Sequence, residues 1–199
     1  MPNHAESQPL FALVSYTPKP LANWLLRLRR SLPVAPASQP HITILPPRPL
    51  TIPLSEAKQT LTARLSSWKS FEVELDGVHV FPSSNILYLD VKDGSSTLRR
   101  LHAELNTGVL AHEECFEFHP HVTIGGPVAS DDLGAILVNA SQTWQSSPAP
   151  RAFRVEEVAL VSISAGKTNK NSRRLWTHNL AVAGVYSLAA GASASTRTF

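Results

Sequence analysis

The chain has 199 residues, of which 43% are hydrophobic and 17% are charged, and its formal net charge is +3. This composition is typical of a folded globular protein and excludes an intrinsically disordered chain. The mild positive charge favours an anionic small molecule or a short nucleic-acid end as partner over a long groove that follows a phosphate backbone.

The sequence contains no apolar run near the roughly 20 residues that a membrane span needs. The polar segment 1–9 lacks the basic and then apolar layout of a signal peptide. We therefore expect a monomeric, cytoplasmic protein without a membrane partner. The single cysteine, Cys115, excludes an intramolecular disulfide.

The first half of the chain alternates segments with strand and helix patterns. Strands are predicted where apolar residues alternate or cluster, and helices where they recur every three to four positions. In chain order the prediction is a strand at 10–16, a helix at 21–32, a strand at 41–45, a helix at 55–68, strands at 71–75, 78–81 and 86–91, and a helix at 96–110. We expect Pro46 and Pro47 to end one strand, because proline has no N–H to donate, and Asp76-Gly77 to form a hairpin turn.

The second half repeats this plan. In chain order it contains a strand at 116–124 that Pro120 interrupts, a helix at 131–144 with acids in its first turn, and strands at 154–163 and 175–182. Because hairpin signals lie between strands, we expect an α+β fold with antiparallel sheets. We expect residues 9–183 to form one domain, residues 1–8 to be flexible and the polar tail 189–199 to be disordered.

One short repeat stands out, Pro-His-Ile-Thr-Ile at 40–44 and Pro-His-Val-Thr-Ile at 120–124, with one copy in each half. Side chains alternate faces along a strand, so the histidine and threonine of each copy share one face and the branched apolar residues take the other. A single His-x-Thr is uninformative, but two copies with matching flanks indicate that four polar groups converge. The candidate catalytic residues are His41, Thr43, His121 and Thr123.

Two imidazoles and two hydroxyls suit phosphodiester chemistry. One histidine can remove a proton from the attacking oxygen while the other protonates the leaving oxygen, because an imidazole titrates near neutral pH. The threonine hydroxyls can donate hydrogen bonds to the non-bridging phosphate oxygens, where negative charge lies in the transition state. The sequence shows no carboxylate cluster suited to Mg²⁺, so we expect neither a metal nor another cofactor.

The segments PHITILPP at 40–47 and FHPHVTIGG at 118–126 resemble the paired motifs of the 2H phosphoesterase superfamily, which includes 2′-5′ RNA ligase-like proteins and cyclic phosphodiesterases. The resemblance implies a bilobal α+β fold, with a pseudo-twofold pair of antiparallel sheets around a central cleft and helices outside. It also implies hydrolysis of a 2′,3′-cyclic phosphate, a 2′-5′ linkage or a related phosphodiester of a nucleotide or RNA end.

Further residues are candidates for substrate binding. His119 falls on the face of His121 by strand parity, as Gln39 does before His41. Arginine forks and lysines can bind a second phosphate, and aromatic rings can stack on a base. The substrate-binding candidates are Tyr16, Arg48, His119, Lys167, Arg173 and Trp176.

Two alternative functions stay open. The same fold could hold a nucleotide or an RNA end without turnover, in which case the histidines would be ligand contacts. RNA 2′-5′ ligation is the reverse reaction on the same site, but the chain has no nucleotidyl-lysine motif to drive ligation with ATP. Which histidine is the base, and whether the product is a 2′- or a 3′-phosphate, cannot be read from the motifs.

Overall fold

The structure is a computed structural model that describes residues 9–34, 39–163 and 172–182. Lys167 and the expected flexible ends, 1–8 and 189–199, lie outside these residues. The described elements are, in chain order, β1 Leu10–Tyr16, α1 Lys19–Ser31, β2 His41–Arg48, α2 Leu54–Leu65, β3 Phe71–Phe81, β4 Ile86–Val91, α3 Ser95–Leu105, a 3₁₀ turn at Gly108–Leu110, β5 His121–Gly125, α4 Ser130–Gln145, β6 Ala152–Val155, β7 Glu157–Ile163 and β8 Ser172–Asn179.

The strands form an eight-stranded sheet in the order β6-β3-β4-β5-β2-β1-β7-β8. All the pairings between neighbouring strands are antiparallel. The sheet has two halves, β6-β3-β4-β5 and β2-β1-β7-β8, which meet where Ile42 of β2 pairs with Val122 of β5. The α+β class and the pseudo-twofold arrangement of antiparallel halves are confirmed, and the two expected sheets are joined into one at this seam.

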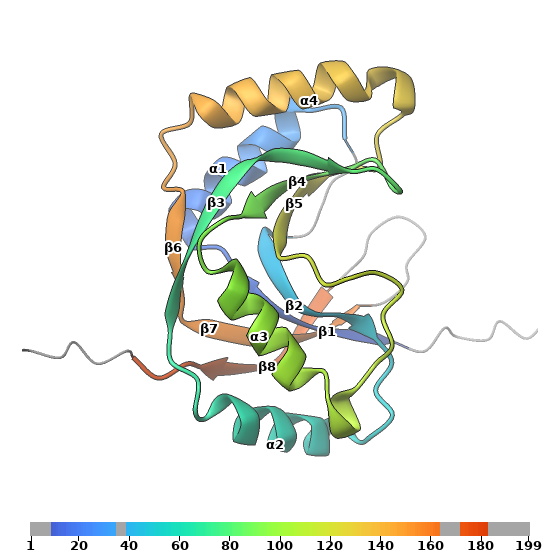
Figure 1. Cartoon of the computed structure of the whole chain (residues 1–199), viewed down its shortest axis with the longest axis vertical. Coiled ribbons are helices and arrows are strands. Elements are labelled where there is room, and N and C mark those ends of the chain that lie inside the picture. The colour runs from blue at the N-terminus through green and yellow to red at the C-terminus, as the bar shows by residue number, and fades with distance from the viewer. Residues whose placement is uncertain (1–8, 35–38, 164–171, 183–199) are drawn as a thin grey trace, which may run out of the picture.

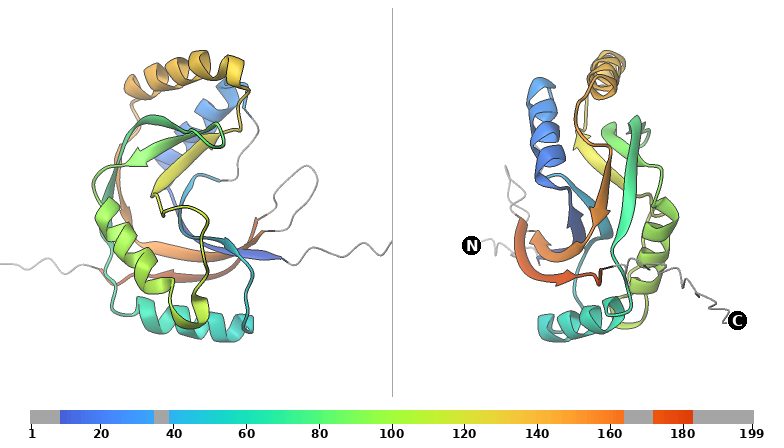
Figure 2. Two further views of the ribbon diagram at one scale, coloured as in Figure 1. Left: turned by 45° about the vertical axis from the view of Figure 1, so that its right-hand side comes forward. Right: turned by 90° about the vertical axis from the view of Figure 1, so that its left-hand side faces the viewer.

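The four helices cover one face of the sheet. Their buried residues belong to the same apolar core as Ile42, Ile44, Val122 and Ile124. In Figures 1 and 2 the sheet curls, β2 and β5 lie side by side near its centre, and α4 and α2 lie at opposite ends. Two helices cross to the other half of the sheet. Helix α1 follows β1 but packs on β5, and α3 follows β4 but packs on β2. We call the face away from the helices the open face.

Two strands differ from the sequence prediction because bulges replace the expected breaks. β2 continues through Pro46 and Pro47 to Arg48, and its pairing with β1 shifts register between Leu45 and Arg48. The bulge accommodates prolines that cannot donate to the ladder. β3 runs unbroken through Asp76-Gly77, where its pairing with β4 shifts register instead of turning. One long strand can therefore pair with β6 near its start and with β4 near its end.

Other boundaries also moved. The expected strand at 116–124 begins only at His121, because Pro120 cannot donate to a ladder. The expected strand at 154–163 is two strands, since β6 pairs with β3 and β7 pairs with β1 in the other half. The helix expected to reach residue 110 ends at Leu105 and is followed by the 3₁₀ turn. None of the helices in the described part of the chain has the length and apolar character needed to cross a bilayer.

Candidate active site

The two His-x-Thr segments lie side by side at the seam between the halves of the sheet. Ile42 and Val122 pair across β2 and β5 and are fully buried in the core. The same register places His41 opposite Thr123, and Thr43 opposite His121. All four side chains are half-buried on the open face. Diagonal positions in an antiparallel pair are roughly 7–8 Å apart, a spacing that suits two rings on either side of one phosphate.

Both histidine rings are fixed in the same way. Nδ1 of His41 lies 2.7 Å from the carbonyl oxygen of Gln39, and Nδ1 of His121 lies 2.7 Å from the carbonyl oxygen of His119. A carbonyl only accepts, so each Nδ1 must be the donor and carry the proton. Each neutral ring therefore has its lone pair on Nε2, the nitrogen that can take or give a proton.

Burial lowers the pKa of both rings. For His41 this is the largest cause, the hydrogen bond to Gln39 opposes it, and the charge of Arg29 lowers the pKa further. For His121 burial again comes first and the hydrogen bond to His119 opposes it. The charges of His119 and His41 lower the pKa of His121, whereas Asp90 raises it. Burial thus favours the neutral form of both rings, and a charge on His41 disfavours a charge on His121.

Aromatic and acidic groups surround the His121 side of the site. The Phe81 ring stacks on Tyr88 with centroids 4.0 Å apart, and it meets the His121 ring edge-on at 4.9 Å. His119, which sequence parity assigned to this face, lies 6.3 Å from His121 between ring centroids. Its Nε2 is 2.9 Å from a carboxylate oxygen of Asp90. The structure therefore brings His119 to the site together with an acidic partner.

The His41 side has different neighbours. The Tyr16 ring lies edge-on to His41 with centroids 6.0 Å apart, and the Arg174 guanidinium lies 4.7 Å above the Tyr16 ring. Beyond Tyr16 the open face is apolar and buried, formed by Ala12, Val14, Ala159 and Val161. The structure thus brings Tyr16 to the site, and the Arg174 guanidinium beside it is paired with Glu157 at 3.2 Å.

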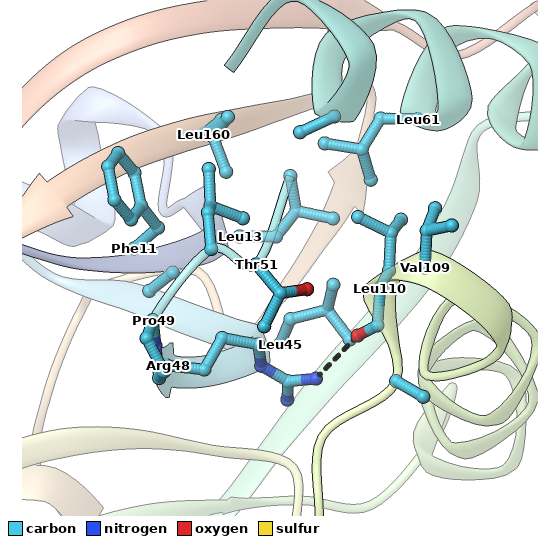
Figure 3. Close-up of a pocket in the computed structure, with 14 residues that line it drawn as sticks. Phe11, Leu13, Leu45, Arg48, Pro49, Thr51, Leu61, Val109, Leu110 and Leu160 are labelled. Carbon is cyan, nitrogen blue, oxygen red and sulfur yellow. Dashed lines mark hydrogen bonds between the residues drawn. The ribbon is translucent and has the colours of Figure 1, made fainter. Parts of the chain in front are cut away.

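Arg48 does not join the histidines. It lies seven residues along β2 from His41, a distance on the order of 20 Å at strand spacing, and its side chain is buried on the other side of the sheet. Arg48 is 2.5 Å from Glu114 and 2.6 Å from the Asn106 amide oxygen, and it donates to the Leu110 carbonyl. Figure 3 shows it beside a small cavity of about 20 Å³ lined mainly by apolar residues. The structure therefore places Arg48 in a buried ion pair and does not bring it to the histidines.

Trp176 and Arg173 also lie off the open face. Trp176 pairs with Leu160 and packs against the main core, and its ring stacks on His178. Arg173 is opposite Ser162, on the side of β8 away from Val161. A register shift between Leu160 and Val161 sets this parity, so that Arg174, not Arg173, meets Tyr16. Lys167 lies outside the described residues.

Five residues around the motifs were not among the site residues predicted from the sequence. Phe81, Tyr88 and Asp90 lie on strands that were predicted, but which strand neighbours which motif could not be known. Arg174 depended on the bulge in β8. Arg29 left a usable signal, because a charged residue on the apolar stripe of a helix is unusual. Within residues 9–34, 39–163 and 172–182, no group of three or more His, Cys, Asp or Glu side chains is placed to hold a metal ion.

The geometry defines what the site can do. Two imidazoles and two threonine hydroxyls lie at neighbouring positions of β2 and β5 on the open face, and the Nδ1 hydrogen bonds leave Nε2 of each ring to exchange protons. This arrangement can move a proton from one oxygen and to another across a phosphorus atom while donating hydrogen bonds to the remaining oxygens.

Comparison with known proteins gives a consistent result. A family model described as the 2′-5′ RNA ligase superfamily matches residues 17–167. A protein of Geobacillus sp. (strain WCH70), named provisionally as a phosphoesterase, is 32% identical over 95 residues, which cover 43% of this chain and 54% of that protein. A similarly named protein of Geobacillus kaustophilus (strain HTA426) is 47% identical over 45 residues, 23% of this chain and 25% of its own. The chain thus matches about half the length, or less, of these curated relatives.

Solved structures establish the same fold. E. coli LigT complexed with 3′-AMP has a TM-score of 0.60 at 17% identity, covering 88% of this chain and 99% of LigT. The protein TT0787 of Thermus thermophilus has a TM-score of 0.62 at 20% identity, covering 87% of this chain and 98% of its own.

Proposed function

The chain belongs to the 2′-5′ RNA ligase superfamily of 2H phosphoesterases, as its paired motifs indicated, and we propose that it is a metal-independent phosphodiesterase. Its substrate is a 2′,3′-cyclic phosphate or a 2′-5′ linked phosphodiester of a nucleotide or RNA end. The observation that carries this proposal is the matched pair of Nδ1 hydrogen bonds, which set both His41 and His121 to act through Nε2.

In the proposed reaction, one Nε2 removes a proton from the water that attacks phosphorus. The new P–O bond forms as the bond to the leaving ribose oxygen breaks, and the other Nε2 gives that oxygen a proton. The Thr43 and Thr123 hydroxyls donate to the non-bridging oxygens, whose charge grows in the transition state. The proton taken and the proton given balance, so the pair returns to its starting state after one exchange with solvent.

Two observations support a nucleotide substrate. Aromatic rings flank both histidines, Tyr16 beside His41 and Phe81 beside His121, and such rings can stack on bases. E. coli LigT, which shares the fold, has been crystallised with 3′-AMP and with phosphate. A nucleotide monophosphate and a bare phosphate are the ligands that a site of this chemistry should accept.

A product assay tests the proposal. The purified protein is incubated with 2′,3′-cyclic mononucleotides, 2′-5′ oligoadenylate, an ADP-ribose cyclic phosphate and RNA with a cyclic phosphate end, each with and without EDTA. We expect at least one substrate to be hydrolysed equally well in EDTA. Activity that EDTA abolishes and Mg²⁺ restores would contradict the metal-independent mechanism.

The same panel separates the alternatives. Tight binding of a nucleotide with no product after long incubation would favour a binding module over an enzyme. Joining of a cyclic phosphate end to a 5′-hydroxyl RNA, at a rate above hydrolysis, would favour ligation. Hydrolysis dominates in our proposal because water is in large excess over RNA ends.

A further inference from the structure

Arg29 occupies an unusual position on α1. It lies among Leu25, Leu28 and Leu32 on the buried side of the helix, and only 7% of it is exposed. Burial lowers the pKa of Arg29 to about 10, which leaves the guanidinium charged at neutral pH. A buried charge is costly unless polar groups compensate for it, so its position calls for a specific role.

The contact that Arg29 makes joins the two halves of the molecule. Its Nη2 donates to the backbone carbonyl of Thr123 in the second His-x-Thr strand. This carbonyl lies one residue past Val122, the residue through which β5 pairs with β2. By chain order α1 belongs with β1 and β2, so Arg29 holds the motif strand of the opposite half.

The opposite half makes a matching contact without a permanent charge. His102 of α3 has its Nδ1 2.8 Å from the carbonyl oxygen of Ile44 in the first His-x-Thr strand. Each motif strand is therefore held by a basic side chain from the helix of the other half. The two contacts differ, because arginine is always cationic, whereas His102 lies 3.6 Å from the Glu114 carboxylate.

This difference makes the site electrostatically asymmetric. The charge of Arg29 from α1 acts on His41. The Tyr16 ring of β1 lies edge-on to His41 with the Arg174 guanidinium above it, and His121 of β5 lies diagonally across the strand pair. The groups facing His121 are His119, Asp90, Tyr88 and His41. Arg174 is itself paired with Glu157 at 3.2 Å, so the charge that distinguishes the His41 side is that of Arg29, whereas the Asp90 carboxylate lies on the His121 side.

We propose that Arg29 is a positioning residue for the reaction: it ties the Thr123 strand to the opposite half of the molecule, and its charge makes His41 the proton acceptor and leaves His121 as the proton donor. This inference rests on the proposed function. It goes further because the twin motifs, being nearly identical, do not distinguish the base from the acid.

The test uses variants that separate charge from hydrogen bonding. Arg29→Gln keeps an N–H donor but removes the charge, and Arg29→Lys keeps the charge but changes the donor. Arg30→Gln is the matched control, because Arg30 is the next residue on α1 and is exposed. For each protein, NMR follows the titration of His41 and His121 without substrate, and the pH profile of kcat/KM follows catalysis.

The expected results follow from the sign of the charge. Removing a cation makes protonated His41 easier to form, so Arg29→Gln should raise the pKa of His41 and move the acidic limb of the profile to higher pH. Arg29→Lys should keep that limb near the wild-type pH while kcat falls on the order of tenfold, because the strand is held less well. Arg30→Gln should change neither.

Other outcomes overturn the inference. An unmoved His41 titration in folded Arg29→Gln, or an equal shift in Arg30→Gln, would contradict it. If Arg29→Gln does not fold, Arg29→Lys provides the test: a shift of the acidic limb of its kcat/KM profile to higher pH would contradict the inference. The NMR titration needs no turnover, so it tests the role of Arg29 even if no substrate in the panel is hydrolysed; that failure would count against the proposed function alone.

Discussion

The two His-x-Thr strands have the same backbone geometry but different surroundings. Each histidine donates Nδ1 to the carbonyl two residues before it, at 2.7 Å in both cases. The charge of Arg29 acts on His41, beside which lie Tyr16 and the Arg174–Glu157 pair. Around His121 lie His119, Asp90, Phe81 and Tyr88. The repeat therefore gives both histidines the same Nδ1 contact, and the unrepeated neighbours give each ring a different electrostatic environment.

The largest expected effect tests the equivalence of the two histidines. His41→Ala and His121→Ala should each lower kcat by about 10²–10⁴-fold, because each removes one positioned acid–base group. His178→Ala, which changes a histidine beside Trp176 away from the site, is the control and should retain activity. Full activity in either motif variant would contradict the proposed pair of acid and base, since the reaction would then need only one imidazole.

Arg48, at the other end of β2 from His41, tests whether the site is confined to the two motifs. We expect Arg48→Met to destabilise the fold by about 3 kcal/mol, because it removes the guanidinium from the buried Glu114 carboxylate and leaves only His102 beside it, at 3.6 Å. Urea unfolding measures the loss. The folded variant should keep the wild-type KM, since Arg48 lies away from the histidines. A large rise in KM with unchanged stability would instead indicate that Arg48 binds the substrate.

The threonines test whether the two strands share the phosphate equally. Thr43→Val and Thr123→Val keep the side-chain shape but remove a hydroxyl donor, and each should lower kcat by about 10²-fold. Steady-state kinetics measures this, with Thr177→Val on the exposed edge of β8 as control. A loss in one variant only would show that a single strand binds the charged oxygens.

Asp90 gives the smallest expected effect. Its carboxylate raises the pKa of His121, so Asp90→Asn should lower that pKa. If His121 must carry a proton to act as the acid, the alkaline limb of the kcat/KM profile should then move to lower pH. The acidic limb, set by His41, should stay in place. A shift of the acidic limb alone would reverse the roles of the two histidines.

The motif residues could be read from the sequence because they depend on local geometry. Period-two alternation on a strand is enough to place His41 with Thr43 and to bury Ile42, and the structure agrees. The α+β class followed from similarly local signals. Local reasoning failed at Asp76-Gly77 and at Pro46 and Pro47, where a bulge satisfied the same residues that a turn or a strand end would have satisfied.

The remaining site residues depend on contacts that are distant in sequence. Arg48 became structural because Glu114 and Asn106 come within reach of it, 66 and 58 residues further along the chain. Arg174 rather than Arg173 faces the site because one register shift changes the parity of β8. Arg29 meets Thr123 only because α1 crosses to the other half. No periodicity encodes these pairings.

A crystal structure with a nucleoside 2′-monophosphate bound tests the central claim most directly. The account predicts one phosphate on the open face, within hydrogen-bond distance of Nε2 of both His41 and His121 and of both threonine hydroxyls. A phosphate bound elsewhere, or held by only one of the two motifs, would contradict it.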